Sequence, residues 1–427
     1  LIAGMIVPGH AMDGIPCFGP FAVGQPNQRD LAQAERLGVS IARLVKKLAQ
    51  NAINMPRSGI RVILDLASTM PDVIHLEIGQ PNFPTPQHII EAAARAAKDG
   101  YTGYTPNAGY LSLREFIAKK IRDENQFDVD ADQIVVTTGG MGGLYSAFAV
   151  LFEAGDEVLL PDPGYPNYEM ISILHGIQVT RYPLDPNQNF NPRLSELEQL
   201  VSPRTKAILI NSPSNPTGAV IPEGIMKGLV EFAEAHDLYI ISDECYEKIV
   251  FDEVHVSPAS LLSPERVISV FSFSKTYAMT GWRVGFVAAS KQIAPILAKM
   301  QEATVACAPS LSQKAAEAAL KGPQECVQEM VRVYQCRRDT TMQILKQHGL
   351  HSYTPQGAFY VLIDIHHTNM DSFHFARQLL IEQKVAVAPG ATFGPLCEGY
   401  IRISLASDDH ALKEGLQRIC SYIHQYR

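Results

Sequence analysis

Apolar runs that do not alternate with polar residues recur along the chain from residue 73, and helix-like stretches separate most of them. Strands that alternate with helices of about 10–15 residues form βαβ units, and strands that are apolar throughout are buried on both faces of a sheet. The sequence therefore predicts an α/β fold, with a mainly parallel sheet and helices on both faces. The expected strands lie at 73–79, 133–140, 156–164, 206–213, 238–244 and 267–275, and the expected helices at 86–98, 110–123, 142–152 and 222–236.

The pattern changes after about residue 290. A long helical segment broken near Pro309 precedes a helix at 324–346, strands at 358–364 and 400–405, and a last helix at 408–424. This order predicts a second, smaller α+β domain. The expected division is an N-terminal extension at 1–52, the first part of the small domain at 53–85, a large domain at 86–300 and the small C-terminal domain at 301–427.

Charge and cysteine content exclude several classes of protein. The formal net charge is −8, which argues against nucleic acid as a partner and leaves no basic patch for a membrane surface. No apolar run is long enough to span a bilayer. Seven cysteines without a CxxC pair favour a reducing, cytoplasmic location over a disulfide framework. The histidines are scattered, so we expect no metal site.

The stretch SFSKTYAMTGWRVGF (272–286) carries the most chemistry. Lys275 follows an apolar strand, and a lysine at the end of a buried strand has a lowered pKa and forms imines. Ser272, Ser274 and Arg283 supply the hydroxyls and the guanidinium that a phosphate dianion needs.

Three other strand ends carry polar groups. Asn215 lies in NSPSNPTG, and Asp243 and Tyr246 lie in SDECYEKI. In TTGGMGGLYSAF the chain turns into a helix, and the free N–H groups near Gly140 and Met141 can bind a phosphate. Because ligands of open α/β sheets lie at the carboxyl ends of the strands, we expect these groups to share one site.

Together these motifs resemble those of the pyridoxal-5′-phosphate-dependent aminotransferases of the aspartate aminotransferase superfamily, fold type I. The resemblance runs from about Pro56 to the C-terminus, and GYIRIS (399–404) is a further match. It implies that Lys275 holds the cofactor as an internal aldimine and later moves the substrate proton. It also implies that Asp243 pairs with the pyridine nitrogen, and that Tyr246 and Asn215 hydrogen-bond the ring oxygen. The remaining implied cofactor contacts are Ser272, Arg283 and the amides of Gly140 and Met141 at the phosphate, and Tyr165 on the ring face.

The resemblance also implies a substrate site and a partner. Arg402 would form a bidentate pair with the substrate α-carboxylate, next to Asn215 and assisted by the backbone of Gly79. A planar guanidinium suits a carboxylate because it donates to both oxygens, which a lysine does not. Tyr104 would reach the phosphate in the neighbouring subunit, which makes a homodimer the expected active unit.

Met141 departs from the pattern of relatives that act on aspartate, in which a lysine often stands at this place. A dicarboxylate buried without a cation is unfavourable, so aromatic or other neutral amino donors are favoured and aspartate stays possible. The expected acceptor is a 2-oxo acid such as 2-oxoglutarate, in a ping-pong cycle. Two alternatives use the same cofactor: a carbon–sulfur β-lyase or decarboxylase, and a non-enzymatic regulator that senses the cofactor.

Residues 1–52 lie outside the aminotransferase pattern. The segment 19–49 resembles the C-terminal end of flavodoxin-like quinone reductases, but it is too short to form a flavin site. We expect either a variable helical arm or the junction of a fusion at this end.

Overall fold

The computed structural model describes residues 48–261, 265–351 and 353–426. The chain divides into two units, Leu1–Met55 and Pro56–Arg427. The described part of the first unit holds the short helix α2 (Gln50–Ile53). Most of the segment that resembles quinone reductases lies outside the described residues. None of the helices in the described ranges is long and apolar enough to cross a membrane.

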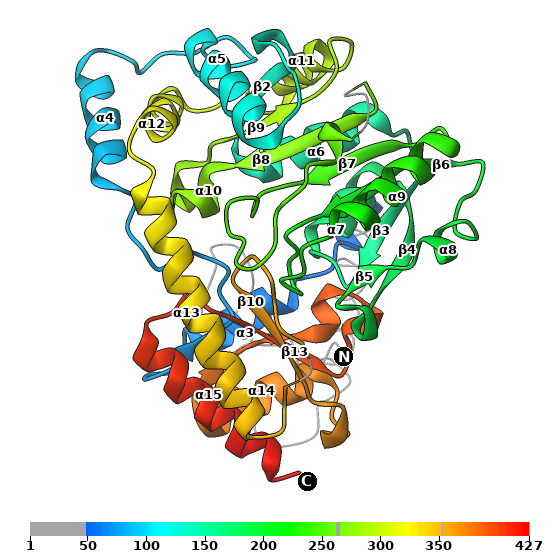
Figure 1. Cartoon of the computed structure of the whole chain (residues 1–427), viewed down its shortest axis with the longest axis vertical. Helices are drawn as coiled ribbons and strands as arrows, with labels where there is room; N and C mark the ends of the chain where they lie inside the picture. The colour runs from blue at the N-terminus through cyan, green and yellow to red at the C-terminus, as the bar shows by residue number, and fades with distance from the viewer. Residues whose placement is uncertain (1–47, 262–264, 352, 427) are drawn as a thin grey trace, which may run out of the picture. The chain divides into compact units, whose positions relative to one another are not determined.

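A large sheet forms the centre of the second unit (Figure 1). Its strands are parallel to their neighbours from β8 to β4, while β9 runs antiparallel to both β2 and β8, and β5 runs antiparallel to β4. A mainly parallel sheet is confirmed. In spatial order the strands are β2 (Ile134–Thr137), β9 (Gly285–Ala288), β8 (Val267–Ser272), β7 (Tyr239–Asp243), β6 (Thr205–Asn211), β3 (Glu157–Asp162), β4 (Gln178–Asp185) and β5 (Asn191–Pro192).

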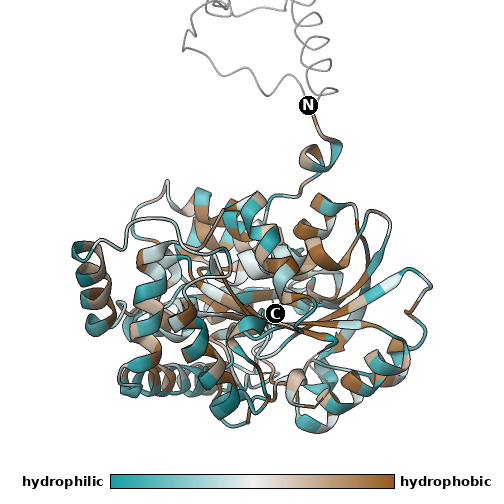
Figure 2. Ribbon diagram, turned by 90° about the horizontal axis from the view of Figure 1, so that it is seen from above, coloured by the Kyte–Doolittle hydropathy of each residue, from teal (hydrophilic) through white to brown (hydrophobic). Residues whose placement is uncertain are grey.

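Successive residues of the strands enter two different cores. In β6, Ile208 and Ile210 belong to one buried cluster, and Ala207 and Leu209 belong to the other. This is the expected result when a strand has an apolar side chain on both of its faces, and Figure 2 shows hydrophobic strands between helices of mixed hydropathy. The first cluster includes side chains of α4 (Gln87–Lys98), α5 (Leu111–Lys120), α9 (Glu223–Ala235) and α12 (Ser310–Lys321). The second includes side chains of α6 (Gly139–Leu151), α7 (Asn167–His175) and α11 (Ala294–Thr304).

A third buried cluster holds the C-terminal part of the unit together. The antiparallel sheet β10–β13–β12 lies here, and the long helix α13 packs against α15 (Figure 1). This region confirms the smaller α+β part predicted from the sequence, while the exact domain boundaries stay predictions. Its elements are α3 (Gly59–Ala67), α13 (Glu325–Gln347), β10 (Tyr360–Asp364), α14 (Ser372–Gln383), β11 (Val385–Ala386), β12 (Ala388–Pro389), β13 (Tyr400–Ser404) and α15 (Asp409–His424).

The expected strand at 73–79 is much shorter in the structure. Only β1 (Ile74–His75) is a strand, and it pairs in parallel with β11 rather than with the large sheet. The next carbonyl, that of Leu76, accepts a hydrogen bond from the backbone N–H of Ser404. The segment therefore joins the C-terminal region, and its later residues run on as a loop toward the ends of the large strands.

Candidate active site

Three neighbouring strands of the large sheet end in polar residues. β6, β7 and β8 are parallel, with Asn211 opposite Asp243 and Asp243 opposite Val270. Asn215 lies in the loop after β6, Asp243 is the last residue of β7, and Lys275 lies in α10 (Phe273–Thr276), directly after β8. The sheet thus brings these three predicted site residues to one edge.

Lys275 has an enclosed amine. Its Nζ donates a hydrogen bond of 2.5 Å to the carbonyl of Gly79, and it lies 6.0 Å from the ring centre of Tyr246 and 5.8 Å from that of Phe359. Burial lowers the pKa of Lys275 to about 8, and nearby acidic groups offset this lowering only in part. About a tenth of this amine is therefore unprotonated at pH 7, far more than of an ordinary lysine, and the unprotonated form is the one that a nucleophile requires.

Asp243 is a buried carboxylate that forms no ion pair within the described residues. Its Oδ2 accepts a hydrogen bond of 2.7 Å from the Tyr168 hydroxyl, and its Oδ1 accepts one of 3.2 Å from the backbone N–H of Cys245. Burial raises the pKa of Asp243, although both of these donors favour the ionised form. A cationic partner in the site would stabilise the carboxylate further.

The first turn of α6 and the segment from Ser272 to Arg283 form an anion cradle. A Cβ on Gly139 would lie 2.7 Å from Nη2 of Arg283, and a Cβ on Gly140 would lie 3.4 Å from Cβ of Ser272. A guanidinium and a hydroxyl thus approach the N-terminus of a 13-residue helix, where free N–H groups attract anions. Met141 lies in the same turn, and its thioether accepts a weak contact of 3.5 Å from Asn167.

Arg402 is a buried guanidinium on β13, with a relative exposure of 1%. Nη2 donates to the carbonyl of Glu77 and Nη1 donates to Oδ1 of Asn215 at 3.0 Å, while Nε has no hydrogen-bond partner among the described residues. The guanidinium lies 4.3 Å from the ring centre of Tyr360 and 4.9 Å from that of Phe393. A buried fork without a carboxylate is suited to an anionic ligand.

Tyr246 and Tyr360 connect these parts of the site. Their hydroxyl oxygens lie 2.7 Å apart, and burial raises the pKa of Tyr246. The Tyr360 hydroxyl also lies against Gly79, because a Cβ on that glycine would be 2.3 Å from it. Tyr360 therefore touches Tyr246, Arg402 and the Gly79 segment at once.

The two remaining predicted tyrosines differ in their surroundings. Tyr165 packs edge-to-face against Tyr168, with ring centres 5.6 Å apart, and so lies beside Asp243. Tyr104 is 92% exposed, and no hydrogen bond or ring contact found among the described residues joins it to the others.

Sequence reasoning missed Tyr168 and Tyr360. Tyr168 follows Tyr165 by three residues at the start of α7, so the helical spacing that places both on one face was the available signal. Tyr360 lies in a buried strand of the C-terminal region, where an ordinary core tyrosine gives the same pattern.

The residues present fit pyridoxal 5′-phosphate. The cofactor needs an amine for covalent attachment, an anion for its protonated ring nitrogen and a cradle for its phosphate. Lys275, Asp243 and the turn at Gly139 and Gly140 provide these three groups at the same sheet edge. The unpaired Nε of Arg402 leaves a hydrogen-bond donor for a substrate carboxylate next to them.

Comparisons with known proteins agree with this chemistry. Residues 71–419 match the family model of aminotransferase class I and II. An aspartate aminotransferase of Pyrococcus horikoshii is 39% identical over 87% of this chain and 96% of its own length. Aromatic-amino-acid aminotransferase 2 of Thermococcus litoralis is 40% identical over 85% of this chain and 94% of its own.

A solved structure gives the same result for the fold. The aspartate aminotransferase of Thermus thermophilus with maleate superposes with a TM-score of 0.84 at 33% identity, covering 88% of this chain and 99% of that one. Members of the matched family use pyridoxal phosphate. The chain therefore belongs to the class I and II aminotransferases, pyridoxal-phosphate-dependent enzymes of fold type I.

Proposed function

We propose that this aminotransferase moves the amino group of an L-amino acid to a 2-oxo acid such as 2-oxoglutarate in a ping-pong cycle. One observation carries the proposal: Lys275 and Arg402 converge on one short segment. Nζ of Lys275 donates to the carbonyl of Gly79, and Nη2 of Arg402 donates to the carbonyl of Glu77. An amino acid whose α-carboxylate pairs with Arg402 then has its Cα beside the Lys275 amine.

Lys275 has two tasks in this proposal. Its Nζ would hold the cofactor covalently, and after the substrate amine has displaced it, the same Nζ would carry the proton from the substrate Cα to the cofactor carbon C4′. The lowered pKa of Lys275, about 8 because of burial, supports both tasks, since a nucleophile and a general base must each be unprotonated.

The other residues orient the cofactor. When bound, its ring draws electrons from the substrate carbon and stabilises the negative charge left there. Asp243 keeps the ring nitrogen protonated, and Tyr246 and Asn215 donate hydrogen bonds to the ring oxygen. The phosphate and the ring face are held by Ser272, Arg283, the amides of Gly140 and Met141, and Tyr165.

Arg402 and Gly79 select α-amino acids. The Arg402 fork receives both carboxylate oxygens, and the Gly79 backbone closes the other side of that subsite. The Arg402 guanidinium is held between the rings of Tyr360 and Phe393. This supports its role, because a preorganised guanidinium loses little freedom when the substrate binds.

Met141 favours aromatic or other neutral donors, with aspartate as the second candidate. Its uncharged thioether lies in the turn next to Gly140, close to the proposed phosphate site. A distal carboxylate buried there would have no cation from this position, which is costly.

Two copies of the chain form the proposed active unit in the cytoplasm. The exposure of Tyr104, 92%, supports a role for its side chain in the neighbouring subunit. The free state of the six described cysteines supports a reducing compartment.

The test is a panel of the twenty amino acids with the purified enzyme and 2-oxoglutarate. Transamination predicts that keto acid appears only when the acceptor is present, whereas a lyase or decarboxylase releases its product without one. Lys275→Ala should abolish both turnover and the borohydride-stable attachment of the cofactor. Lys291→Ala, which changes an exposed lysine paired with Asp130, should keep both. Full turnover in the Lys275 variant would refute the assignment.

A further inference from the structure

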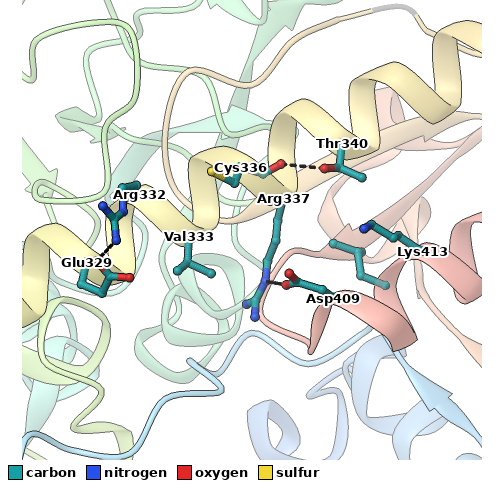
Figure 3. Close-up of a pocket in the computed structure, with 9 residues that line it drawn as sticks. Glu329, Arg332, Val333, Cys336, Arg337, Thr340, Asp409 and Lys413 are labelled. Atoms are coloured by element: carbon teal, nitrogen blue, oxygen red, sulfur yellow. Dashed lines mark hydrogen bonds and ion pairs between the residues drawn. The ribbon is translucent and has the colours of Figure 1, made fainter.

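Arg337 is a buried arginine outside the proposed chemistry. It lies on α13, with a relative exposure of 8%, at the inner side of a groove between α13 and α15 (Figure 3). Figure 3 shows its side chain reaching from α13 to Asp409 at the start of α15. Its Nε donates to Oδ1 of Asp409 at 2.8 Å.

The other end of the guanidinium binds two segments that come from different parts of the chain. Nη1 donates to Oδ1 of Asn82 at 2.9 Å and to the carbonyl of Leu405 at 3.1 Å. The guanidinium also lies 5.7 Å from the ring centre of Phe83, and that ring packs against Tyr334 of α13. One side chain thus holds residues 82 and 83 against residue 405.

Both segments lead directly to the proposed carboxylate subsite. Asn82 follows Gly79 by three residues, and Leu405 follows Arg402 by three residues. We propose, on the basis of the function proposed above, that Arg337 is a positioning residue that fixes the distance between Gly79 and Arg402. It touches neither substrate nor cofactor, and it acts through the two segments that do.

Replacing Arg337 would release both segments. The Leu405 carbonyl is buried and would lose this donor, and Asn82 would lose its link to α13. A subsite whose two sides are no longer held in place binds its ligand less tightly, because the ordering cost is then incurred on binding. We therefore expect the affinity for the substrate carboxylate to fall, while the groups around Asp243 and the phosphate cradle stay in place.

The neighbouring Arg338 is a matched control. It is 3% exposed, and it likewise bonds carboxylates, here Asp252 and Asp339, and one backbone carbonyl, that of Pro355 at 3.0 Å. It also lies 5.0 Å from the centre of a phenylalanine ring, that of Phe251. Its partners do not adjoin Gly79 or Arg402, so it reproduces the burial and bonding of Arg337 without the link.

The experiment compares Arg337→Met with Arg338→Met in the holoenzyme. Arg337→Met should raise KM for every amino donor about tenfold, with kcat changed less than about twofold, because a displaced carboxylate subsite weakens substrate binding. The affinity for an α-methyl amino acid, which binds but has no Cα proton, should fall by the same factor in a titration of the cofactor absorbance. Arg338→Met should lower Tm to a similar extent and leave KM and this affinity unchanged.

Two further variants keep the test decisive. Asn82→Ala should show part of the rise in KM with little loss of Tm, and should add nothing to Arg337→Met, because the two residues act through one contact. If Arg337→Met does not fold, Arg337→Lys and Asn82→Ala provide the same comparison. Equal KM values in the Arg337 and Arg338 variants would overturn the inference.

Arg402→Lys, measured in parallel, separates this inference from the proposed function. If Arg402→Lys leaves kcat/KM unchanged for every donor, the proposed carboxylate subsite is wrong. If only the Arg402 variant raises KM, the subsite stands and the role of Arg337 is wrong.

Discussion

The Tyr168 hydroxyl donates a 2.7 Å hydrogen bond to Oδ2 of Asp243, and both groups are buried. The bond joins the first turn of α7 to the end of β7 across 75 residues of sequence. It fixes the orientation of the carboxylate that we assign to the cofactor ring nitrogen.

Tyr168→Phe should therefore weaken cofactor binding about tenfold, because the Asp243 carboxylate loses a donor that favours its ionised form and holds its orientation. Tyr168 lowers the pKa of Asp243 against the effect of burial, so its loss raises that pKa. The carboxylate then becomes neutral at a higher pH, and cofactor affinity should be lost earlier as the pH falls. Equilibrium titration of the apoenzyme with cofactor at several pH values measures both effects.

Tyr182→Phe is the control for this change. Tyr182 is equally buried, but its hydroxyl donates to the carbonyl of Leu209. The variant should lose stability and keep the cofactor affinity and its pH dependence. The same shift in both variants would contradict a specific role for Tyr168.

The rate at which Lys275 reacts with the cofactor should depend on pH with a midpoint near pH 8. Burial lowers its pKa from 10.5 to about 8, and only the unprotonated amine attacks an aldehyde. The rate of attachment to the apoenzyme, followed by absorbance, should rise with pH and level off above pH 8. A midpoint near that of an exposed lysine would show that the amine is not desolvated in solution.

Arg402→Lys should lower kcat/KM by about 100-fold for every amino donor alike, because lysine lacks the bidentate fork for the shared α-carboxylate. Steady-state kinetics with an aromatic, an aliphatic and an acidic donor checks the uniformity. A loss confined to one class of donor would place Arg402 at the substrate side chain instead.

Met141→Lys should shift donor preference toward aspartate by about tenfold relative to phenylalanine, since a cation offsets the cost of a buried distal carboxylate. The ratio of the two kcat/KM values is the measurement. Met141→Gln has similar length without the charge and should leave the ratio unchanged. If both variants behave alike, residue 141 does not face the distal group.

The central strands were predictable because their residues are apolar on both faces. β7 and β8 lie within the predicted runs 238–244 and 267–275, and β6 begins one residue before the predicted run 206–213. β9 was not predicted, because its four residues, Gly285–Ala288, become a strand only by pairing with β2 and β8. β4 was missed for a related reason: most of its residues are only partly buried, so the apolar signal is weak.

The candidate site also contains residues that could be predicted from the sequence and residues that could not. Asn215, Asp243 and Lys275 could be predicted because each follows an apolar run, and strand ends meet at one edge of a parallel sheet. Tyr360 could not, because its contact with Tyr246 spans 114 residues and depends on the packing of the C-terminal region against the large sheet. Arg337 is a similar case, since its partner Asn82 lies 255 residues away.

The hydrogen bond from Arg402 to the Glu77 carbonyl joins residues 325 positions apart, and the one from Lys275 to Gly79 spans 196. Contacts of such separation form late, because long loops must close before they contribute stability. During synthesis the site that contains both contacts cannot be complete until β13, which carries Arg402, has left the ribosome. The cofactor should accordingly bind to a chain that has already folded, rather than guide its early collapse.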